Sequence, residues 1–555
     1  MSDRQFPFHV ALLATASPLM VCVPAAAQTR LDRADPTIVE QTLPKPSAVP
    51  ADPQAPLIQP PTINPAVTPI RTGTIAAVIV DSGGEIPPAV LAPAYADAIG
   101  RDLDGAALAA LVERIADAAR KAGYPFASAA IDAQTMRDGV LRVRVDPGKI
   151  DAVRVIGARS TAADALLGKA LATGHAVRRR QLERALLLVG DIPGVRVAST
   201  RFVRQDGFGI LLVTIEFDRA SAYAQVDNRG SQEVGPLRST LLGSLRGVAS
   251  SGDELALLAS QTPTEPSEFA FVRARYAAPV DRDGSLLSVS GSYGRSHPGG
   301  FLRPLDVIGR SVDLGVTYAR PLLRSRDRSL WTSVELRAVT IRQTLLGRLL
   351  RDDRLATLTG SVNGVSRLAG GVMRGEVGVT TGLPLDGVTH QGDLRTSRPD
   401  GDARFVSAGY TVDWAWRLAP PVSVVVASSG QLASRPLLAT AELGLGGPVF
   451  GRGYDYAERT GDQGILASVE LRGDLGPFIP HLIERVQLYG FVDGGMVTNL
   501  RGGTGGGSLF SSGGGVRFGL VGLDAMVEAA LPINADRFDT RDKRPRISFR
   551  LSRAF

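Results

Sequence analysis

The sequence predicts two small α+β modules followed by a transmembrane antiparallel β-barrel of about 16 strands. Three observations lead to this fold class. Between residues 72 and 219, strand and helix patterns occur twice in the same order. From about residue 220 onward helical periodicity disappears, and apolar residues alternate with polar ones. The chain of 555 residues has one cysteine, so disulfides cannot stabilise it.

The first 27 residues have the pattern of a secretory signal peptide. Arg4 and His9 precede an apolar run at 10–23, and the three alanines at 25–27 fit the cleavage rule. The single cysteine, Cys22, lies inside this segment. A lipoprotein signal is the alternative, but it requires a small residue where Val21 stands. We therefore expect a bacterial envelope protein whose mature chain contains no cysteine.

Residues 28–71 form a proline-rich linker. They contain 10 prolines, which favours an extended, polyproline-like chain without a core of its own. The part from Leu31 to Leu43 could form a short helix, but Pro36 argues against a long one.

Two modules follow, at 72–148 and 149–219. The first has strand patterns at 74–80, 126–131 and 140–145 and a helix pattern at 106–122. The second has strand patterns at 150–156, 195–203 and 209–217 and helix patterns at 162–172 and 179–189. This order indicates an architectural repeat of about 70 residues.

Short motifs in these modules resemble tandem POTRA domains. They are Gly123-Tyr124 after the helix, Asp138-Gly139-Val140-Leu141 at the last strand, and Gly148-Lys149-Ile150 at the junction. The alternative is a pair of generic sandwich-like modules. The resemblance implies a periplasmic location ahead of an outer-membrane barrel, with an edge strand that accepts an extended client strand by β-augmentation.

Residues 220–555 alternate as membrane-spanning strands do. Apolar faces recur in four segments: Val406, Ala408, Tyr410, Val412, Trp414 and Trp416; Ile465, Ala467, Val469 and Leu471; Leu523, Ala525, Val527 and Ala529; and Ile547, Phe549 and Leu551. A soluble sandwich also alternates, but its strands are shorter. Charged residues recur on the opposite face, which favours a barrel with a wet lumen. About 20 residues per strand and connection give about 16 strands.

One glycine-rich loop, at 446–464, is a candidate functional element. It places Arg452 between two glycines, followed by Gly453-Tyr454. In the later strand 486–495 we expect Val486, Leu488, Gly490 and Val492 to face lipid and Gln487, Tyr489, Phe491, Asp493 and Gly495 to face the lumen. If the loop folds into the lumen, Arg452 could form a bidentate pair with Asp493. Small residues at Gly495, Gly513 and Gly515 would leave room for the loop. An ordinary surface loop is the alternative.

These motifs resemble the two-partner-secretion transporters of the haemolysin secretion/activation (ShlB/FhaC/HecB) family. The family's loop motif Val-Arg-Gly-Tyr/Phe is matched at 451–454, with glycine at the first position. Its Phe-x-Asp-x-Gly is matched at Phe491, Asp493 and Gly495, and its Gly-x-Gly-x-Arg at Gly513, Gly515 and Arg517. Further similar segments are Glu470-Leu471-Arg472 and Asp227-Asn228-Arg229-Gly230. The resemblance covers about 72–555, and it leaves open whether an N-terminal helix plugs the pore, as it does in some relatives.

The resemblance implies a lumenal loop lock formed by Arg452, Gly453, Tyr454 and Asp493. It also implies a type V secretion pathway without covalent chemistry, in which an unfolded secreted polypeptide docks on the POTRA domains and threads through the barrel. Phe555 resembles the C-terminal signal read by the barrel-assembly machinery. Other expected contacts are outer-membrane lipid and lipopolysaccharide, and the chain is expected to be monomeric.

Other functions find little support in the sequence. The formal net charge of +7 could suit nucleic acid, but the arginines are scattered singly. A Walker motif and metal-ligand spacing of histidines are absent from the sequence, so we expect neither an enzyme, a cofactor nor a metal. An assembly factor for other barrels remains an alternative from the same superfamily, and a passive porin or receptor is a third.

Overall fold

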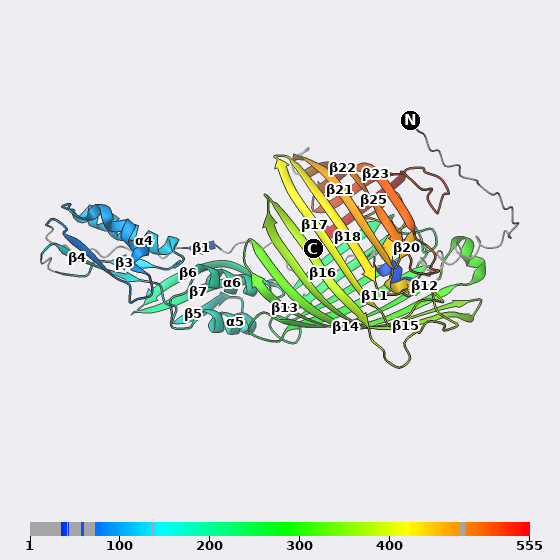
Figure 1. The fold of residues 1–555 in the computed structure, drawn as a ribbon, viewed down its shortest axis with the longest axis horizontal. Coiled ribbons are helices and arrows are strands. Elements are labelled where there is room, and N and C mark those ends of the chain that lie inside the picture. Colours follow the sequence, from blue (N-terminus) through cyan, green and yellow to red (C-terminus); the bar gives the residue numbers. More distant parts are fainter. Residues whose placement is uncertain are drawn as a thin grey trace, which may run out of the picture.

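The computed structural model describes residues 35–41, 43, 57–59, 73–134, 138–205, 207–476 and 483–555. The two modules lie in a row next to one end of a closed barrel (Figure 1). The predicted signal peptide at 1–27 lies outside the described residues. None of the described helices combines the length and the apolar composition of a membrane span.

The first module is a three-stranded sheet covered by two helices. Its elements are β2 (Ala77–Asp81), α3 (Pro88–Tyr95), η1 (Ala96–Ala98), α4 (Gly105–Lys121), β3 (Ser128–Ala130) and β4 (Val140–Asp146), with strand order β2-β4-β3. Asp104 caps α4 by accepting a hydrogen bond from Ala107 N at 2.7 Å. Leu108, Leu111 and Ile115 form its buried face. The segment prediction missed α3, whose Pro88 suits the first turn of a helix.

The second module repeats this architecture and gains a strand from the linker. Its elements are β5 (Ala152–Gly157), α5 (Thr161–Leu171), α6 (Arg179–Gly190), β6 (Val195–Gln205) and β7 (Phe208–Phe217). The linker strand β1 (Leu57–Gln59) pairs in parallel with β6. Phe126 of the first module stacks on Phe202 of the second with ring centroids 4.7 Å apart. The modules therefore share core contacts at their junction.

Sixteen antiparallel strands form the closed barrel, because β25 pairs with β8. In chain order they are β8 (Ala220–Asp227), β9 (Arg238–Arg246), β10 (Glu254–Gln261), β11 (Phe269–Pro279), β12 (Leu286–Ser296), β13 (Ile308–Arg324), β14 (Arg328–Leu345), β15 (Arg348–Leu368), β16 (Gly371–Gly382), β17 (Val406–Ala419), β18 (Val422–Ala433), β21 (Gln463–Gly476), β22 (Ile483–Thr498), β23 (Gly507–Leu520), β24 (Leu523–Pro532) and β25 (Arg546–Ala554). The predicted fold class is confirmed.

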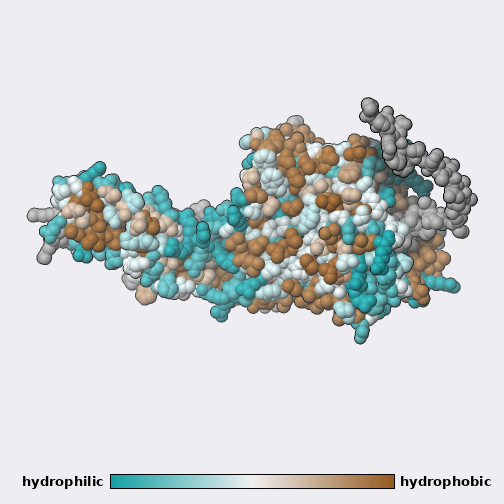
Figure 2. All heavy atoms as spheres, in the orientation of Figure 1, coloured by the Kyte–Doolittle hydropathy of each residue, from teal (hydrophilic) through white to brown (hydrophobic). Residues whose placement is uncertain are grey.

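The barrel wall is apolar outside and polar inside. Val377, Val469 and Val527 are each about half exposed on the outer face, and Figure 2 shows broad hydrophobic areas on the barrel. Ser468, Glu470 and Asp493 are buried on the inner face. Val486 keeps the outward parity of Leu488 in its pairing with β23, but its side chain is covered by neighbours and is only 7% exposed. It lies where β22 shifts register with both neighbouring strands.

A short helix lies against the inside of the barrel, a point that the sequence left open. Helix α2 (Pro36–Glu40) begins at Pro36, a residue that the first turn of a helix tolerates. Gly294 of β12 makes space for it, because a Cβ there would lie 2.6 Å from the Pro36 Cβ. Glu40 forms an ion pair with Arg273 of β11. The described helix has five residues.

The second module is attached to the barrel by a buried ion pair. Asp191, which ends α6, accepts hydrogen bonds from Arg324 of β13 at 2.6 and 2.7 Å. The Arg324 side chain is 3% exposed and its guanidinium lies over the Trp331 ring. Bidentate geometry and a low-dielectric setting make such a pair directional, so it restrains how the module is oriented on the barrel.

Replacing Arg324 is expected to loosen this junction. Arg324→Gln leaves the Asp191 carboxylate buried without its cation, which costs about 3–5 kcal/mol. Hydrogen–deuterium exchange of α6 and the segment after it should therefore become faster. Arg326→Gln is the matched control, since Arg326 is exposed and contributes its backbone N–H to Glu183. Equal exchange in both variants would contradict a restraining role for Arg324.

Candidate functional site

A loop folded into the barrel carries the motif residues. It connects strands β19 (Leu443–Leu445) and β20 (Arg459–Gly461), which pair with each other as a separate hairpin after the short helix η3 (Ala439–Ala441). Gly446 and Gly447 have φ of +107° and +112°, and a Cβ on Gly446 would lie 2.1 Å from Asp455 O. Only glycine permits this turn, which directs the loop onto β22 and β23.

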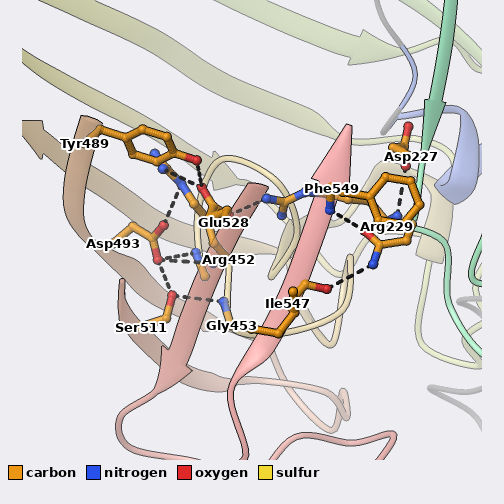
Figure 3. A network of polar contacts seen from close by, with 12 residues as sticks. Asp227, Arg229, Arg452, Gly453, Tyr489, Asp493, Ser511, Glu528, Ile547 and Phe549 are labelled. Atoms are coloured by element: carbon orange, nitrogen blue, oxygen red, sulfur yellow. Dashed lines mark hydrogen bonds and ion pairs between the residues drawn. The ribbon is translucent and has the colours of Figure 1, made fainter. Parts of the chain in front are cut away.

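Arg452 is buried among three carboxylates of the barrel wall, and Figure 3 shows it next to two of them, Asp493 and Glu528. Its Nη1 lies 2.6 Å from Glu470 Oε2 and 3.2 Å from Glu528 Oε2, and its Nε lies 3.1 Å from Asp493 Oδ2. The guanidinium carbon is 4.1 Å from the centroid of the Phe491 ring, a cation–π distance. The loop is therefore held to β21, β22 and β24 through one side chain.

Asp493 binds the backbone of the loop as well as its arginine. Its Oδ1 accepts hydrogen bonds from Gly451 N at 3.0 Å and Arg452 N at 3.2 Å, and from the Ser511 hydroxyl. Gly453 N in turn donates to Ser511 Oγ at 3.2 Å. The Asp493 carboxylate therefore holds in place both the charged side chain of Arg452 and the backbone of the loop.

The expected bidentate Arg452–Asp493 pair is wrong, although the two residues meet. Only Nε approaches Asp493, and neither this Nε nor Asp493 Oδ2 completes a hydrogen bond. Geometry explains the difference, because backbone donors and Ser511 already occupy Oδ1 while Glu470 and Glu528 attract the guanidinium end. Arg452 is shared by three acids instead of being paired with one.

Tyr454 fixes the other end of the motif to the end of the barrel that is remote from the two modules. Its side chain is fully buried, and its hydroxyl donates to Phe510 O at 3.2 Å or Ala535 O at 3.1 Å. Ala535 N donates back to the hydroxyl at 3.3 Å. The ring packs with Leu445, Leu466 and Leu509, so removing it would open a cavity next to Arg452.

The remaining motif residues build the wall that faces Arg452. Arg517 donates to Glu470 Oε1 at 2.8 Å and stacks 3.9 Å from the Tyr489 ring centroid. Tyr489 in turn donates to Glu528 Oε2 at 2.9 Å. A Cβ on Gly513 would lie 2.8 Å from Phe491, and a Cβ on Gly515 would lie 2.6 Å from the Tyr489 hydroxyl. The nearest atoms are backbone carbonyls of β24, Ala529 O at 2.1 Å from Gly513 and Val527 O at 2.4 Å from Gly515. Both glycines therefore permit close strand pairing as well as making room for the rings, whereas room for the loop had been expected.

Gly495 and Phe555 lie away from the Arg452 contacts. A Cβ on Gly495 would lie 2.3 Å from Ile465 O, so this glycine permits close strand pairing. The Phe555 side chain is 67% exposed, while its backbone exchanges hydrogen bonds with Ala222 of β8. The role of Phe555 as an insertion signal remains a prediction.

Sequence reasoning missed the acids and bases that complete the network. Glu528 also forms an ion pair with Arg229, and Arg546 forms one with Asp455 of the loop. The alternating pattern had placed Glu470 and Glu528 on the inner face, and that parity was the available signal. Register between distant strands, which the pattern does not contain, brings both within reach of Arg452. Among the described residues, no group of three potential ligands could hold a metal ion.

Two family models match the chain. The model described as "Haemolysin secretion/activation protein ShlB/FhaC/HecB" matches residues 210–518. The model described as "POTRA domain, ShlB-type" matches residues 74–148. Together they cover the first module and most of the barrel, including Arg452, Asp493 and Arg517.

Individual relatives are distant in sequence. The "Heme/hemopexin transporter protein HuxB" of Haemophilus influenzae (strain 86-028NP) is 22% identical over 411 residues, which are 71% of this chain and 70% of that protein. The solved structure of CdiB from Escherichia coli has a TM-score of 0.67 at 17% identity and covers 97% of this chain and 100% of its own. BamA from Haemophilus ducreyi lacking POTRA domains 1–3 has a TM-score of 0.55 at 14% identity, covering 87% and 99%.

Loss of the Arg452 charge is expected to destabilise the loop in the lumen. Arg452→Ala leaves Glu470, Glu528 and Asp493 buried together without this cation, and breaking a buried pair costs about 3–5 kcal/mol. The midpoint of heat-induced barrel unfolding, followed by electrophoretic mobility, should fall.

Arg459→Ala in β20 is the control, because Arg459 is exposed and has no ion pair among the described residues. Equal losses in the two variants would show that Arg452 has no special role. The double variant Arg452→Asp/Asp493→Arg should not restore stability. The Asp493 carboxylate also accepts hydrogen bonds from two backbone N–H groups, and an arginine cannot accept them.

Proposed function

Because this chain belongs to the haemolysin secretion/activation (ShlB/FhaC/HecB) family, we propose that it exports one unfolded secreted partner through its barrel. Its barrel lies in the bacterial outer membrane and its POTRA domains in the periplasm. The observation that carries the proposal is the lumenal loop, which is anchored in the barrel by Arg452. A removable obstruction inside a closed barrel suits controlled passage of a polypeptide better than the steady diffusion expected of a passive porin.

Client recognition is assigned to the POTRA domains. A groove of about 550 Å³ lies where they meet, and the edge strand β3 lines it together with Arg144 and Arg204. An extended segment could add to β3 by backbone hydrogen bonding, without a fixed client sequence. Each of the two sheets has two edge strands, and β3 is the one whose whole length lines the groove. We therefore assign β3 to the client, since β6 of the other module is already paired with the linker strand β1.

The loop and α2 are proposed to leave the lumen during export. Tyr456 donates from the loop to Gln41 Oε1, just after α2, at 2.7 Å. Thr440 of η3, which precedes the loop hairpin, donates from its hydroxyl to Thr37 Oγ1 of the helix at 3.2 Å. These contacts join the two lumenal elements, so displacement of one weakens the hold on the other. Direction then comes from folding of the client outside the cell, because the proposal includes no covalent step.

Several partners follow from this location. We propose that the barrel contacts outer-membrane lipid and lipopolysaccharide, that the barrel-assembly machinery inserts it through the segment ending at Phe555, and that it acts as a monomer without nucleic acid. Assembly of other barrels is the alternative function. The similarity to BamA concerns the fold, whereas the family model that matches most of the barrel is one for secretion.

Export is tested by co-expression with the product of the adjacent open reading frame. We expect that product in the medium only when this chain is present. Outer-membrane barrels are quantified in the same cells. Unchanged export together with a fall in other barrels would replace the secretion proposal with the assembly alternative.

A negative charge on β3 should weaken client docking. Ala130→Asp places a carboxylate on the edge strand, a substitution that discourages strand addition, and we expect export to fall about tenfold or more. Ala110→Asp on the exposed side of α4 is the matched control in the same domain. Export that is unaffected by Ala130→Asp would exclude β3 as the docking edge.

A further inference from the structure

Three arginines form a row on the outside of the barrel. Arg295 of β12 is the direct pairing partner of Arg310 of β13, and Arg310 is the direct partner of Arg342 of β14. All three side chains are exposed. They share the outer face with Tyr293, Val312 and Leu336, which are 45%, 45% and 49% exposed. The row therefore belongs to the lipid-facing wall and not to the lumen.

The row lies at the extracellular edge of the apolar band. Chain direction fixes this end, because β8 leaves the periplasmic POTRA domains at Ala220 and every strand then alternates in direction. On β13 the outward residues run from Arg310 through Val312, Leu314, Val316 and Tyr318 to Arg320. The apolar segment is thus bounded by one arginine at each end, and Arg310 marks the outer leaflet.

Little in the protein balances these charges. Among the described residues, the side chains of Arg295 and Arg310 have no hydrogen-bond or ion-pair partner. Asp352 of β15 lies 3.3 Å from Arg342, but it is shared with Arg354 at 3.0 Å. Like charges directly opposite each other in a sheet are destabilising. Outward residues at the same end of β18, β21 and β22 are Leu432, Ile465 and Met496, so the charge is confined to one part of the wall.

An apolar hollow adjoins the row. It has a volume of about 320 Å³ and lies over β9 to β12, lined by Leu241, Ala259, Ala270, Val272 and Tyr293 among others. Ala270 is the direct pairing partner of Arg295. The small side chains of Ala259 and Ala270 create the depression between larger neighbours. Charge and hollow together suit an amphiphile with an anionic head and an apolar tail.

We propose that this surface binds lipopolysaccharide, with its lipid A phosphates on Arg295, Arg310 and Arg342 and one acyl chain in the hollow. Guanidinium groups bind phosphate through charge-assisted hydrogen bonds. A head with more than one phosphate bridges adjacent guanidiniums and converts their repulsion into attraction. The inference deepens the proposed contact between the barrel and lipopolysaccharide, and it does not depend on protein export.

The test uses the full-length protein in detergent and measures its affinity for hexa-acylated, bisphosphorylated lipid A. In the triple variant Arg295→Gln/Arg310→Gln/Arg342→Gln the affinity should fall about a hundredfold at low ionic strength. Arg320→Gln, at the periplasmic end of β13, is the matched control and should bind as the original protein does. Heat-shifted electrophoretic mobility reports whether each barrel is folded. If the triple variant does not insert into the membrane, the single variant Arg310→Gln replaces it in the test, and its affinity for lipid A is expected to fall about fivefold.

Two further ligands define the site. Lipid A without its phosphates should bind the original protein as weakly as lipid A binds the triple variant, and phosphatidylglycerol should bind weakly to both. Unchanged lipid A affinity in the arginine variants would overturn the proposal. Equal affinity for phosphatidylglycerol or for inorganic phosphate would also overturn it, because either would indicate a general anion surface. Partner export, measured in the same variants, is expected to persist, so loss of lipid binding is distinguishable from failure of the pore.

Discussion

Closure of the hydrogen-bond ladder is the constraint on which this structure depends. Within lipid an open strand edge would leave backbone groups without partners, so β25 must return to β8. Five residue pairs connect these strands. Two additions lengthen the seam: Asn228 exchanges side-chain hydrogen bonds with the backbone at Ile547 and Phe549, and Phe555 bonds to Ala222. Closure separates an inner face from an outer face, and every other feature of the barrel follows from that division.

On the inner face, charge is balanced by sharing. Arg452 alone cannot neutralise three acids, but Arg229 contacts Glu528, and Arg472 and Arg517 both donate to Glu470. The loop therefore adds one cation, Arg452, to a group of acids whose negative charge is already partly neutralised by other arginines. A buried charge left without its partner is costly, and the loop is correspondingly hard to displace piece by piece. In the proposed export, movement of the whole hairpin with water entering behind it would avoid leaving a single carboxylate unpaired in an apolar setting.

Arginines that point to the two faces of the barrel wall lie in opposite environments. Arg337 of β14 points inward and pairs with Asp313, whereas Arg342, five positions later, points outward into the row with Arg310. Successive side chains of a strand point to opposite faces, so two residues separated by an odd number of positions lie on opposite faces of the barrel wall. The inner arginines find acids on neighbouring strands. The outer ones face the membrane surface, where Asp352 lies beside Arg342 and where, on our proposal, lipid phosphates supply the remaining anions.

The sequence by itself determined the two modules, the sixteen-strand barrel and the inward positions of Arg452's partners, because periodicity and strand parity are local properties. It also indicated that Arg452 and Asp493 belong together, through a resemblance to a family. Only the tertiary structure decided that Glu470 and Glu528 share the guanidinium, that Gly513 makes room for Phe491, and that α2 enters the lumen. These outcomes depend on the register between strands that are far apart in the chain and on which donors bind the Asp493 carboxylate. Neither can be deduced from a local sequence pattern.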